Sequence, residues 1–334
     1  MISVHPEKMD KKTLDSILDL SKLVFYSNIE SSEFLNLRKK CHNYFDRNML
    51  NSCYLLNESN QEIIGACLLL HRRVKALDLE IPSIFLSQVM IHPRYQGKGY
   101  FYKLMESVDK FLLANGKSLV LVVARKSVDG LYGLVGYSGF ATFSDFYVNL
   151  RGNFAQSEDR KLDNMQSEFV EDLLQLQAQV YKNQFLTLVR EFDDWMQIIE
   201  GQESSNYRIK VLTYKGAIEA YVIFKNSNVI EIASYSESGY LNILGQEFIG
   251  EEFTLAIQKS HPALKSLDKY IIGQNHRKVF DGGHLFKFFE EPAKMVGNNV
   301  HLFEVIASQQ TSPPPYLSLN FDDLEGRILP LDEF

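Results

Sequence analysis

The sequence predicts an α+β protein made of two successive copies of one folding unit, at residues 1–150 and 166–292. The chain has 334 residues, and a prior of roughly 150 residues per domain suggests two domains. Its composition is 45% hydrophobic and 23% charged, as in ordinary globular proteins. Each half opens with two helical patterns and continues with strands, and matching elements are offset by roughly 150 residues.

The first half begins with two helices and three strands. Apolar residues between Leu14 and Leu23 recur near helical spacing, which predicts the first helix. The sequence Asn-Glu-Ser-Asn at 57–60 predicts a turn between two strands. We expect the helices at 11–29 and 31–48, and the strands at 52–57, 62–71 and 84–91.

The clearest helix of the protein follows these strands. From Phe101 to Leu112, apolar residues repeat on one face and polar residues occupy the other. Asn115 and Gly116 are typical of a helix end. The apolar run at 118–124 predicts a strand covered on both faces. A short helix near 128–134 and two strands within 137–150 complete this half.

The second half repeats this order after a polar linker at 151–165. We expect helices at 166–183 and 189–200, strands at 207–213, 217–225 and 228–235, then a helix at 240–258 and a strand at 268–273. Residues 293–334 contain three consecutive prolines and an excess of acids. This composition predicts an acidic C-terminal tail.

Charge is divided unequally between the halves. The net charge is −7; residues 1–150 carry 18 Lys and Arg against 15 Asp and Glu, and residues 151–334 carry 17 against 27, which gives +3 and −10. The negative total argues against general nucleic-acid binding, which needs a basic face. The basic half suits an anionic cofactor, and the acidic half suits a cationic substrate.

Nothing in the sequence predicts a membrane segment or a metal site. The longest buried-type run, 119–124, is too short to span a bilayer, and residues 1–12 lack the apolar core of a signal peptide. Cys41, Cys53 and Cys67 form no C-x-x-C pair and no zinc pattern with a nearby histidine. We therefore expect a reduced cytoplasmic protein without a bound metal.

The segment from Ile84 to Phe101 carries the chemistry. A strand runs into a loop with two glycines, and the loop opens the amphipathic helix. Gly97 and Gly99 permit unusual dihedrals and a close approach of the backbone to a ligand. Backbone N–H groups of such a loop and of a helix start bind anions, and Arg94 and Lys98 add positive charge. The pattern predicts a pyrophosphate site, although an ordinary glycine turn between strand and helix also fits it.

This segment resembles the GNAT superfamily of acetyltransferases. Gln96–Gly99 (Gln-Gly-Lys-Gly) is similar to the Q/R-x-x-G-x-G/A coenzyme A signature, and Leu131–Tyr137 resembles the Y-x-x-x-G-F/Y element. Phe101 departs from the signature, which has a small residue there. The chain looks most like the enhanced-intracellular-survival-type branch, in which a degenerate second GNAT domain follows the catalytic one. The resemblance is specific over 84–143.

The resemblance implies a mixed twisted sheet flanked by helices, with acetyl-CoA as the acyl donor. It places the pantetheine arm beside a strand that splays from its neighbour, and it makes Tyr132 the general acid. A phenol with a pKa of about 10 is a poor proton donor to a thiolate with a pKa of about 8.5, so Tyr132 either has a shifted pKa or acts as a hydrogen-bond donor to sulfur. The implied cofactor-binding residues are Val89, Met90, Ile91, Gln96, Gly97, Lys98, Gly99 and Tyr100.

The general base is left open by the sequence. Many relatives carry a glutamate where this chain has Phe85. The alternatives are Glu80, a water relay ordered by Ser87 and Gln88, and the terminal carboxylate of Phe334. Because a protonated alkyl amine cannot attack a thioester, one of these groups must receive its proton.

The second half lacks the glycine loop, since only Gly239 follows its strand and Glu237 would repel a phosphate. We expect no coenzyme A there; its expected roles are to wall one side of the substrate cleft and to mediate homo-oligomerisation. The leading hypothesis is an N-acetyltransferase acting on a primary amine of a small-molecule or peptide substrate in a ternary complex. The alternatives are a catalytically inactive acyl-CoA-binding sensor and an enzyme for longer acyl chains, with Phe101 shaping the tunnel.

Overall fold

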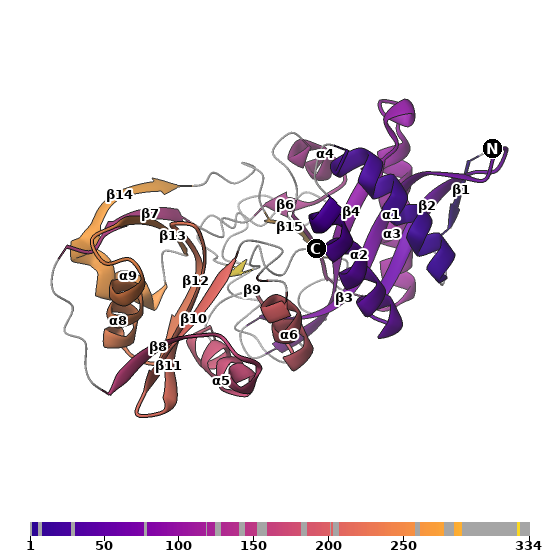
Figure 1. Ribbon diagram of the computed structural model, residues 1–334. Coiled ribbons are helices and arrows are strands. Elements are labelled where there is room, and N and C mark those ends of the chain that lie inside the picture. The colour runs from indigo at the N-terminus through magenta and orange to yellow at the C-terminus, as the bar shows by residue number, and fades with distance from the viewer. Residues whose placement is uncertain are drawn as a thin grey trace. The chain divides into compact units, whose positions relative to one another are not determined.

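The protein was analysed as a computed structural model in which the chain divides into two compact units (Figure 1). Each unit contains its own sheet and its own buried core. Among the described residues, no helix is long and apolar enough to cross a membrane. The structure describes residues 2–5, 9–27, 31–76, 79–117, 119–123, 128–139, 144–151, 159–181, 186–200, 202, 207–257, 261–276, 284–288 and 326–327.

The first unit is built on a mixed sheet whose strands follow the order β1-β2-β3-β4-β5-β15-β6. All neighbours are antiparallel except β4 and β5, which run parallel. The strands are β1 (Ile2–His5), β2 (Leu50–Asn57), β3 (Glu62–Ala76), β4 (Leu79–Ile91), β5 (Leu119–Val123), β6 (Ser138–Gly139) and β15 (His284–Phe288).

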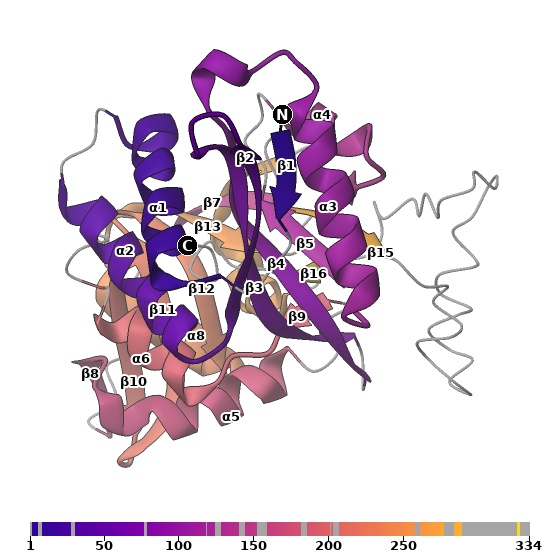
Figure 2. The ribbon, with the colours of Figure 1, turned by 90° about the vertical axis from the view of Figure 1, so that its right-hand side faces the viewer.

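Helices cover both faces of this sheet: α1 (Lys11–Phe25) and α2 (Ser31–Asp46) lie on one side, and α3 (Tyr100–Ala114) lies on the other (Figure 2). The Asp10 side chain caps α1 by accepting a hydrogen bond from the Thr13 N–H at 2.7 Å. The apolar face of α3 is buried as its spacing predicted, and the helix ends at Asn115 and Gly116, where φ is +60° at the glycine. The short helix α4 (Asp129–Gly133) follows β5.

An irregularity in β4 creates the gap in which the site lies. Its register against β3 shifts between Ser87 and Met90, and Gln88 has a φ of +51°, which marks a β-bulge. The parallel pairing of β4 with β5 ends at Leu86 and Val122. The last residues of β4 therefore present a backbone edge that β5 does not cover.

The second unit repeats the same plan. Its sheet follows the order β8-β10-β11-β12-β13-β7-β14, with only β12 and β13 parallel. Its strands are β8 (Arg160–Asn164), β10 (Arg208–Tyr214), β11 (Ala217–Lys225), β12 (Asn228–Ser234), β13 (Glu252–Ile257), β7 (Ser144–Asn149) and β14 (Ile271–His276), and its helices are α5 (Val170–Val180), α6 (Phe192–Glu200), α8 (Glu237–Glu247) and α9 (Pro262–Leu267). A short parallel pair, β9 (Leu186–Leu188) with β16 (Gly326–Arg327), is not part of this seven-stranded sheet.

The division of the chain differs from the predicted boundaries at residues 150 and 292. Strand β7 lies between β13 and β14 in the second unit, and β15 lies between β5 and β6 in the first. In each sheet, one strand next to an edge therefore comes from the other half of the sequence: β15 in the first unit and β7 in the second. Strand alternation predicts that a segment joins a sheet, but not which sheet it joins.

Two further expectations differ from the structure. Part of the predicted linker at 151–165 forms β8, the edge strand of the second sheet. The predicted helix at 240–258 is divided, because α8 ends at Glu247, Gly250 has a φ of +75°, and β13 begins at Glu252. Most of the predicted tail, 293–334, lies outside the described residues.

Candidate active site

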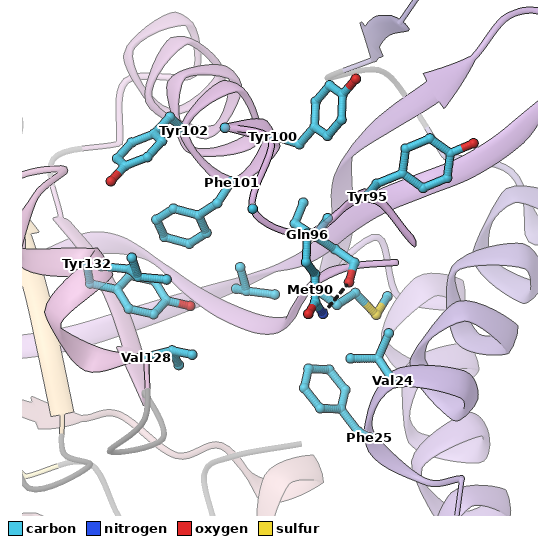
Figure 3. Close-up of a pocket in the computed structure, with 15 residues that line it drawn as sticks. Val24, Phe25, Met90, Tyr95, Gln96, Tyr100, Phe101, Tyr102, Val128 and Tyr132 are labelled. Carbon is cyan, nitrogen blue, oxygen red and sulfur yellow. Dashed lines mark hydrogen bonds between the residues drawn. The ribbon is translucent and has the colours of Figure 1, made fainter. Parts of the chain in front are cut away.

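A pocket of about 460 Å³ opens in the first unit at the gap beside β4. Figure 3 shows its lining, which comes from the end of α1, the end of β4, the loop before α3, the first turn of α3, and α4. The residues that line it are Val24, Phe25, Val89, Met90, Ile91, Tyr95, Gln96, Gly97, Gly99, Tyr100, Phe101, Tyr102, Val128, Leu131 and Tyr132. Eight of the nine site residues predicted from the sequence are in this set.

The glycine loop forms one end of the pocket. Gly97 and Gly99 have φ values of +72° and +77°, a backbone region that side chains with a Cβ rarely adopt. Gly99 is also the N-cap of α3 and provides no side-chain cap. The first N–H groups of a helix have no partner within the helix, so this end of the pocket presents donors and the positive end of the α3 dipole.

Lys98 is the one predicted residue that does not line the pocket. Its Nζ donates a hydrogen bond to the Arg94 carbonyl at 3.0 Å and lies 5.4 Å from the centre of the Tyr95 ring. The Lys98 ammonium group is therefore bound by the loop. Its positive charge adds to the electrostatic potential near the pocket, but the side chain is not part of the pocket lining.

The uncovered edge of β4 forms the floor of the pocket through Val89, Met90 and Ile91. The Gln96 amide folds back and donates to the Ile91 carbonyl at 3.0 Å (Figure 3). Within the bulge, Gln88 accepts a hydrogen bond from the Ser21 hydroxyl of α1. Side-chain amides thus add hydrogen bonds to the part of β4 that pairs with β3 but not with β5.

Tyr132 lies at the opposite side of the pocket from α1, and its hydroxyl points into the space (Figure 3). Its ring packs edge-to-face on Phe101, with ring centres 5.3 Å apart, and on Tyr137, with ring centres 5.4 Å apart. Only 4% of the residue is exposed. Burial raises the pKa of the Tyr132 phenol well above its ordinary value, so this side chain is a protonated donor at neutral pH.

Sequence reasoning missed the apolar side chains that line two sides of the pocket. Val24 and Phe25 come from the last turn of α1, and Val128 and Leu131 come from α4 and the residue before it. The available signal was the run Leu23-Val24-Phe25, which extends beyond the buried stripe of α1. Phe101, noted as a departure from the signature, becomes part of the wall that holds Tyr132.

One of the named base candidates, Glu80, does not line the pocket. Glu80 pairs with Arg73 at 3.0 Å and is half exposed; it stands nine residues before Val89, about 30 Å along the strand at roughly 3.3 Å per residue. Glu80 is thus a surface ion-pair residue. Phe85, which replaces the glutamate of many relatives, is buried, and Phe334 lies outside the described residues.

At the corresponding place in the second unit, side chains occupy the edge of the separated strand. The pairing of β12 with β13 covers only Asn228 and Val229 of β12, so these strands also separate. Beyond that point the Tyr181 hydroxyl donates to the Ile232 carbonyl at 2.6 Å and lies 3.3 Å from His261 Nε2. Residues 235–236 replace the loop at 92–99.

The start of α8 in the second unit also differs from that of α3. The Ser236 hydroxyl accepts from the Gly239 N–H at 2.9 Å and donates to Glu219 at 2.7 Å. Arg160 donates two hydrogen bonds to the same Glu219 carboxylate. Glu237 pairs with Lys265 at 2.7 Å. A serine therefore caps this helix start, and the Glu219 carboxylate lies beside the cap.

The described residues contain no cluster of three or more His, Cys, Asp or Glu side chains suited to a metal ion. All three cysteines are free and buried. Burial raises the pKa of the Cys41 thiol to about 12, so this thiol is protonated at neutral pH and unsuited to act as a nucleophile.

Residues 5–140 match the family model described as "Acetyltransferase (GNAT) domain". This match confirms the GNAT resemblance of the first unit. No curated protein sequence matches the chain significantly.

Solved structures with a similar fold confirm the α+β architecture. A GCN5-related N-acetyltransferase from Kribbella flavida is 12% identical with a TM-score of 0.67, over 86% of this chain and 72% of that one. A protein from Enterococcus faecalis V583, described as a probable N-acyltransferase, is 13% identical with a TM-score of 0.68 over 86% and 73%. Eis1 from Mycobacterium abscessus is 10% identical with a TM-score of 0.58 over 86% and 73%. At these identities the likeness concerns the fold alone.

Proposed function

We propose that the protein, whose first unit is a GNAT acetyltransferase domain, is an acetyl-CoA-dependent N-acetyltransferase that acts on a primary amine. The observation that carries the proposal is the single pocket that brings together the α3 N-terminus, the uncovered β4 edge and the Tyr132 hydroxyl. An anion site, a groove for an extended arm and a buried proton donor are the parts that thioester transfer requires.

The residues present fit acetyl-CoA. The backbone of Gln96 to Tyr100 would hold the pyrophosphate, because Gly97 and Gly99 free that backbone of side chains at the helix start. The edge from Val89 to Ile91 would hold the amides of the pantetheine arm. When bound, acetyl-CoA supplies the activated acetyl group.

Tyr132 has the role of stabilising the sulfur as the amine attacks directly. Because burial raises its pKa, the phenol keeps its proton at neutral pH and donates a hydrogen bond to developing negative charge on sulfur. Full proton transfer to the thiolate is disfavoured by the same shift. We thus assign Tyr132 as an electrostatic stabiliser more than a general acid.

The amine must lose a proton before attack. None of the described residues that line the pocket is a carboxylate or a histidine. We propose that a water relay at the β4 bulge, ordered by Ser87 and Gln88, passes that proton to solvent, or that the terminal carboxylate of Phe334 accepts it. Deletion of Phe334 distinguishes the two. It moves the terminal carboxylate by one residue and leaves the bulge unchanged, so a lower rate of acetyl transfer would indicate the terminal carboxylate.

The acceptor is proposed as a small-molecule or peptide amine that is cationic in solution. The described pocket lining carries no charged side chain, so preference for a cation rests on the charge of −10 over residues 151–334.

We also propose homo-oligomerisation through the second unit. A cytoplasmic location is suggested by three free cysteines.

Thiol release from acetyl-CoA, measured against polyamines, aminoglycosides, lysine peptides and amino sugars, tests the function. We expect turnover with at least one class. Tyr132→Phe should lower kcat by about 10–100-fold, because one preorganised donor to the transition state is lost, and should leave the affinity for acetyl-CoA unchanged. Tyr147→Phe, at an exposed tyrosine of the second unit, is the matched control. Equal kinetics of Tyr132→Phe and the parent would remove Tyr132 from the mechanism.

A second candidate is an acyl-CoA-binding sensor without catalysis, favoured by Phe85 in the place of the usual acid. Thermal stabilisation by acetyl-CoA together with no thiol release from any amine would support this candidate. A lack of stabilisation would contradict both functions.

A further inference from the structure

We propose that Lys287 of β15 is a positioning residue that sets the orientation of Tyr132. The proposal rests on the acetyltransferase function given above. Lys287 lies far from the other site residues in the sequence, yet β15 brings it into the first unit between β5 and β6. Its ammonium group there joins α3 to the turn that follows Tyr132.

The contacts of Lys287 are short and largely sheltered. Nζ lies 2.7 Å from Asp109 Oδ2 of α3 and donates to the Val135 carbonyl at 3.0 Å. The Lys287 side chain is 12% exposed and that of Asp109 is 28% exposed. Charge-assisted hydrogen bonds in such sheltered surroundings are stronger and more directional than surface ion pairs.

The turn held by Lys287 is the one that closes onto Tyr132. The N–H groups of Val135 and Tyr137 both donate to the Tyr132 carbonyl, at 3.0 and 3.1 Å. Gly136 has a φ of +88°, and a Cβ there would lie 3.5 Å from Lys287 Cε. The Lys287 methylenes therefore run along the turn, and its ammonium group ends on the Val135 carbonyl.

The same lysine also acts through the aromatic rings. Its Nζ lies 5.9 Å from the centre of the Tyr137 ring, and the Tyr137 ring packs edge-to-face on Tyr132. On its other side Tyr132 meets Phe101, which belongs to α3, as does Asp109. Lys287 thus joins the two elements between which the Tyr132 ring is held.

Anchoring β15 to the sheet does not require these contacts. The backbone of β15 pairs with β5 from His284 to Phe288, and with β6 at Leu285 and Phe286. The side chain of Lys287 is thus available for a second task. A small displacement of a catalytic group costs a large factor in rate, so loss of this link should appear in kcat.

Kinetics of the whole chain test the proposal, with Lys287→Met, which keeps an unbranched side chain one atom shorter and removes its charge. We expect kcat to fall about tenfold with the affinity for acetyl-CoA within about twofold of the parent. Lys287→Arg, which keeps the charge and donors, should recover most of the rate. The double variant Lys287→Met with Tyr132→Phe should be no slower than Tyr132→Phe alone, because the lysine acts through that hydroxyl.

The matched control is Lys110→Met on α3. Lys110 pairs with Glu106 at the same distance of 2.7 Å, but both side chains are mostly exposed, and that pair does not contact the Tyr132 turn. It should leave kcat unchanged. Additive losses in the double variant, or an unchanged kcat for Lys287→Met, would overturn the positioning role.

A readout independent of turnover separates this proposal from the proposed function. With 3-fluorotyrosine at position 132, the fluorine resonance should shift or broaden in Lys287→Met and stay in place in Lys110→Met. Should Lys287→Met fail to fold, Asp109→Asn, which keeps the shape of the acceptor, replaces it in both measurements. An unmoved resonance in the folded variant contradicts the proposal even if no amine is acetylated, whereas a shifted resonance without turnover contradicts only the enzymatic function.

Discussion

The two units share one strand order, but they differ in what lies in the gap between their parallel strands. In the first unit, β4 leaves β5 at Leu86 and its free edge borders an open pocket. In the second, β12 leaves β13 after Val229, and Tyr181 and His261 occupy the polar edge at Ile232. The separation of the parallel strands is thus common to both units, whereas an open pocket depends on which side chains occupy the gap.

The helix starts show the same contrast. Gly99 caps α3 without a side chain, while Ser236 caps α8 and connects it to the Glu219 carboxylate. A helix end that lacks internal partners favours a bound anion, and one that is already capped beside a carboxylate does not. One copy of the unit can thus keep a ligand site while the other uses the same positions for its own stability.

The largest effect should come from Gly99→Asp, which puts a carboxylate at the N-cap of α3, where α8 of the second unit has Ser236 beside the Glu219 carboxylate. The substitution strains a residue at φ +77° and puts a carboxylate where the pyrophosphate would bind. We expect the affinity for acetyl-CoA to fall by about 1,000-fold or more, equal to about 4 kcal/mol, as measured by titration calorimetry.

Its control is Gly250→Asp in the second unit. Gly250 has a similar φ of +75° and open space around the Cβ position, so it reproduces the backbone strain without touching the pocket. Acetyl-CoA should bind this variant as it binds the parent. Retained affinity in Gly99→Asp would refute the assignment of the phosphate loop.

The sequence could single out the glycine loop and Tyr132 because their signal is local; their roles in binding phosphate and in catalysis stay predictions. Gly97 and Gly99 are required by their own dihedrals, and most of the loop lines the pocket as expected. The exchange of strands was not predictable, because the buried alternation of Phe146 and Val148 is the same whichever sheet the strand joins. A contact within the loop itself decided the place of Lys98, whose ammonium group binds the Arg94 carbonyl four residues earlier.

A smaller effect concerns the acid sensitivity of the second unit. His261 is buried, and burial lowers its pKa from 6.5 to about 4. The folded state binds a proton on His261 more weakly than the unfolded state does. The contribution of neutral His261 to the free energy of unfolding is therefore complete above pH 6.5, and it is lost as the pH falls from 6.5 toward 4. The loss amounts to at most about 3 kcal/mol.

His261→Asn should reduce this loss while keeping an acceptor for the Ala263 N–H that His261 Nδ1 now caps. Urea unfolding between pH 4.5 and 7, followed by the fluorescence of the single tryptophan, measures it. Trp195 is buried in the core of the second unit, so its signal reports that unit. An equal dependence on pH in the parent and in His261→Asn would show that His261 does not set the acid sensitivity.

The smallest effect tests whether side chains hold the second gap closed. Tyr181→Phe removes the hydroxyl that donates to the Ile232 carbonyl at 2.6 Å, so that buried carbonyl loses one hydrogen-bond donor. We expect the free energy of unfolding reported by Trp195 to fall by about 1 kcal/mol, with acetyl-CoA affinity unchanged. Tyr235→Phe, at an exposed tyrosine between β12 and α8, should have no effect. Equal stability of the two variants would mean that apolar packing alone closes the gap, and that the two units differ in their loops rather than in this hydrogen bond.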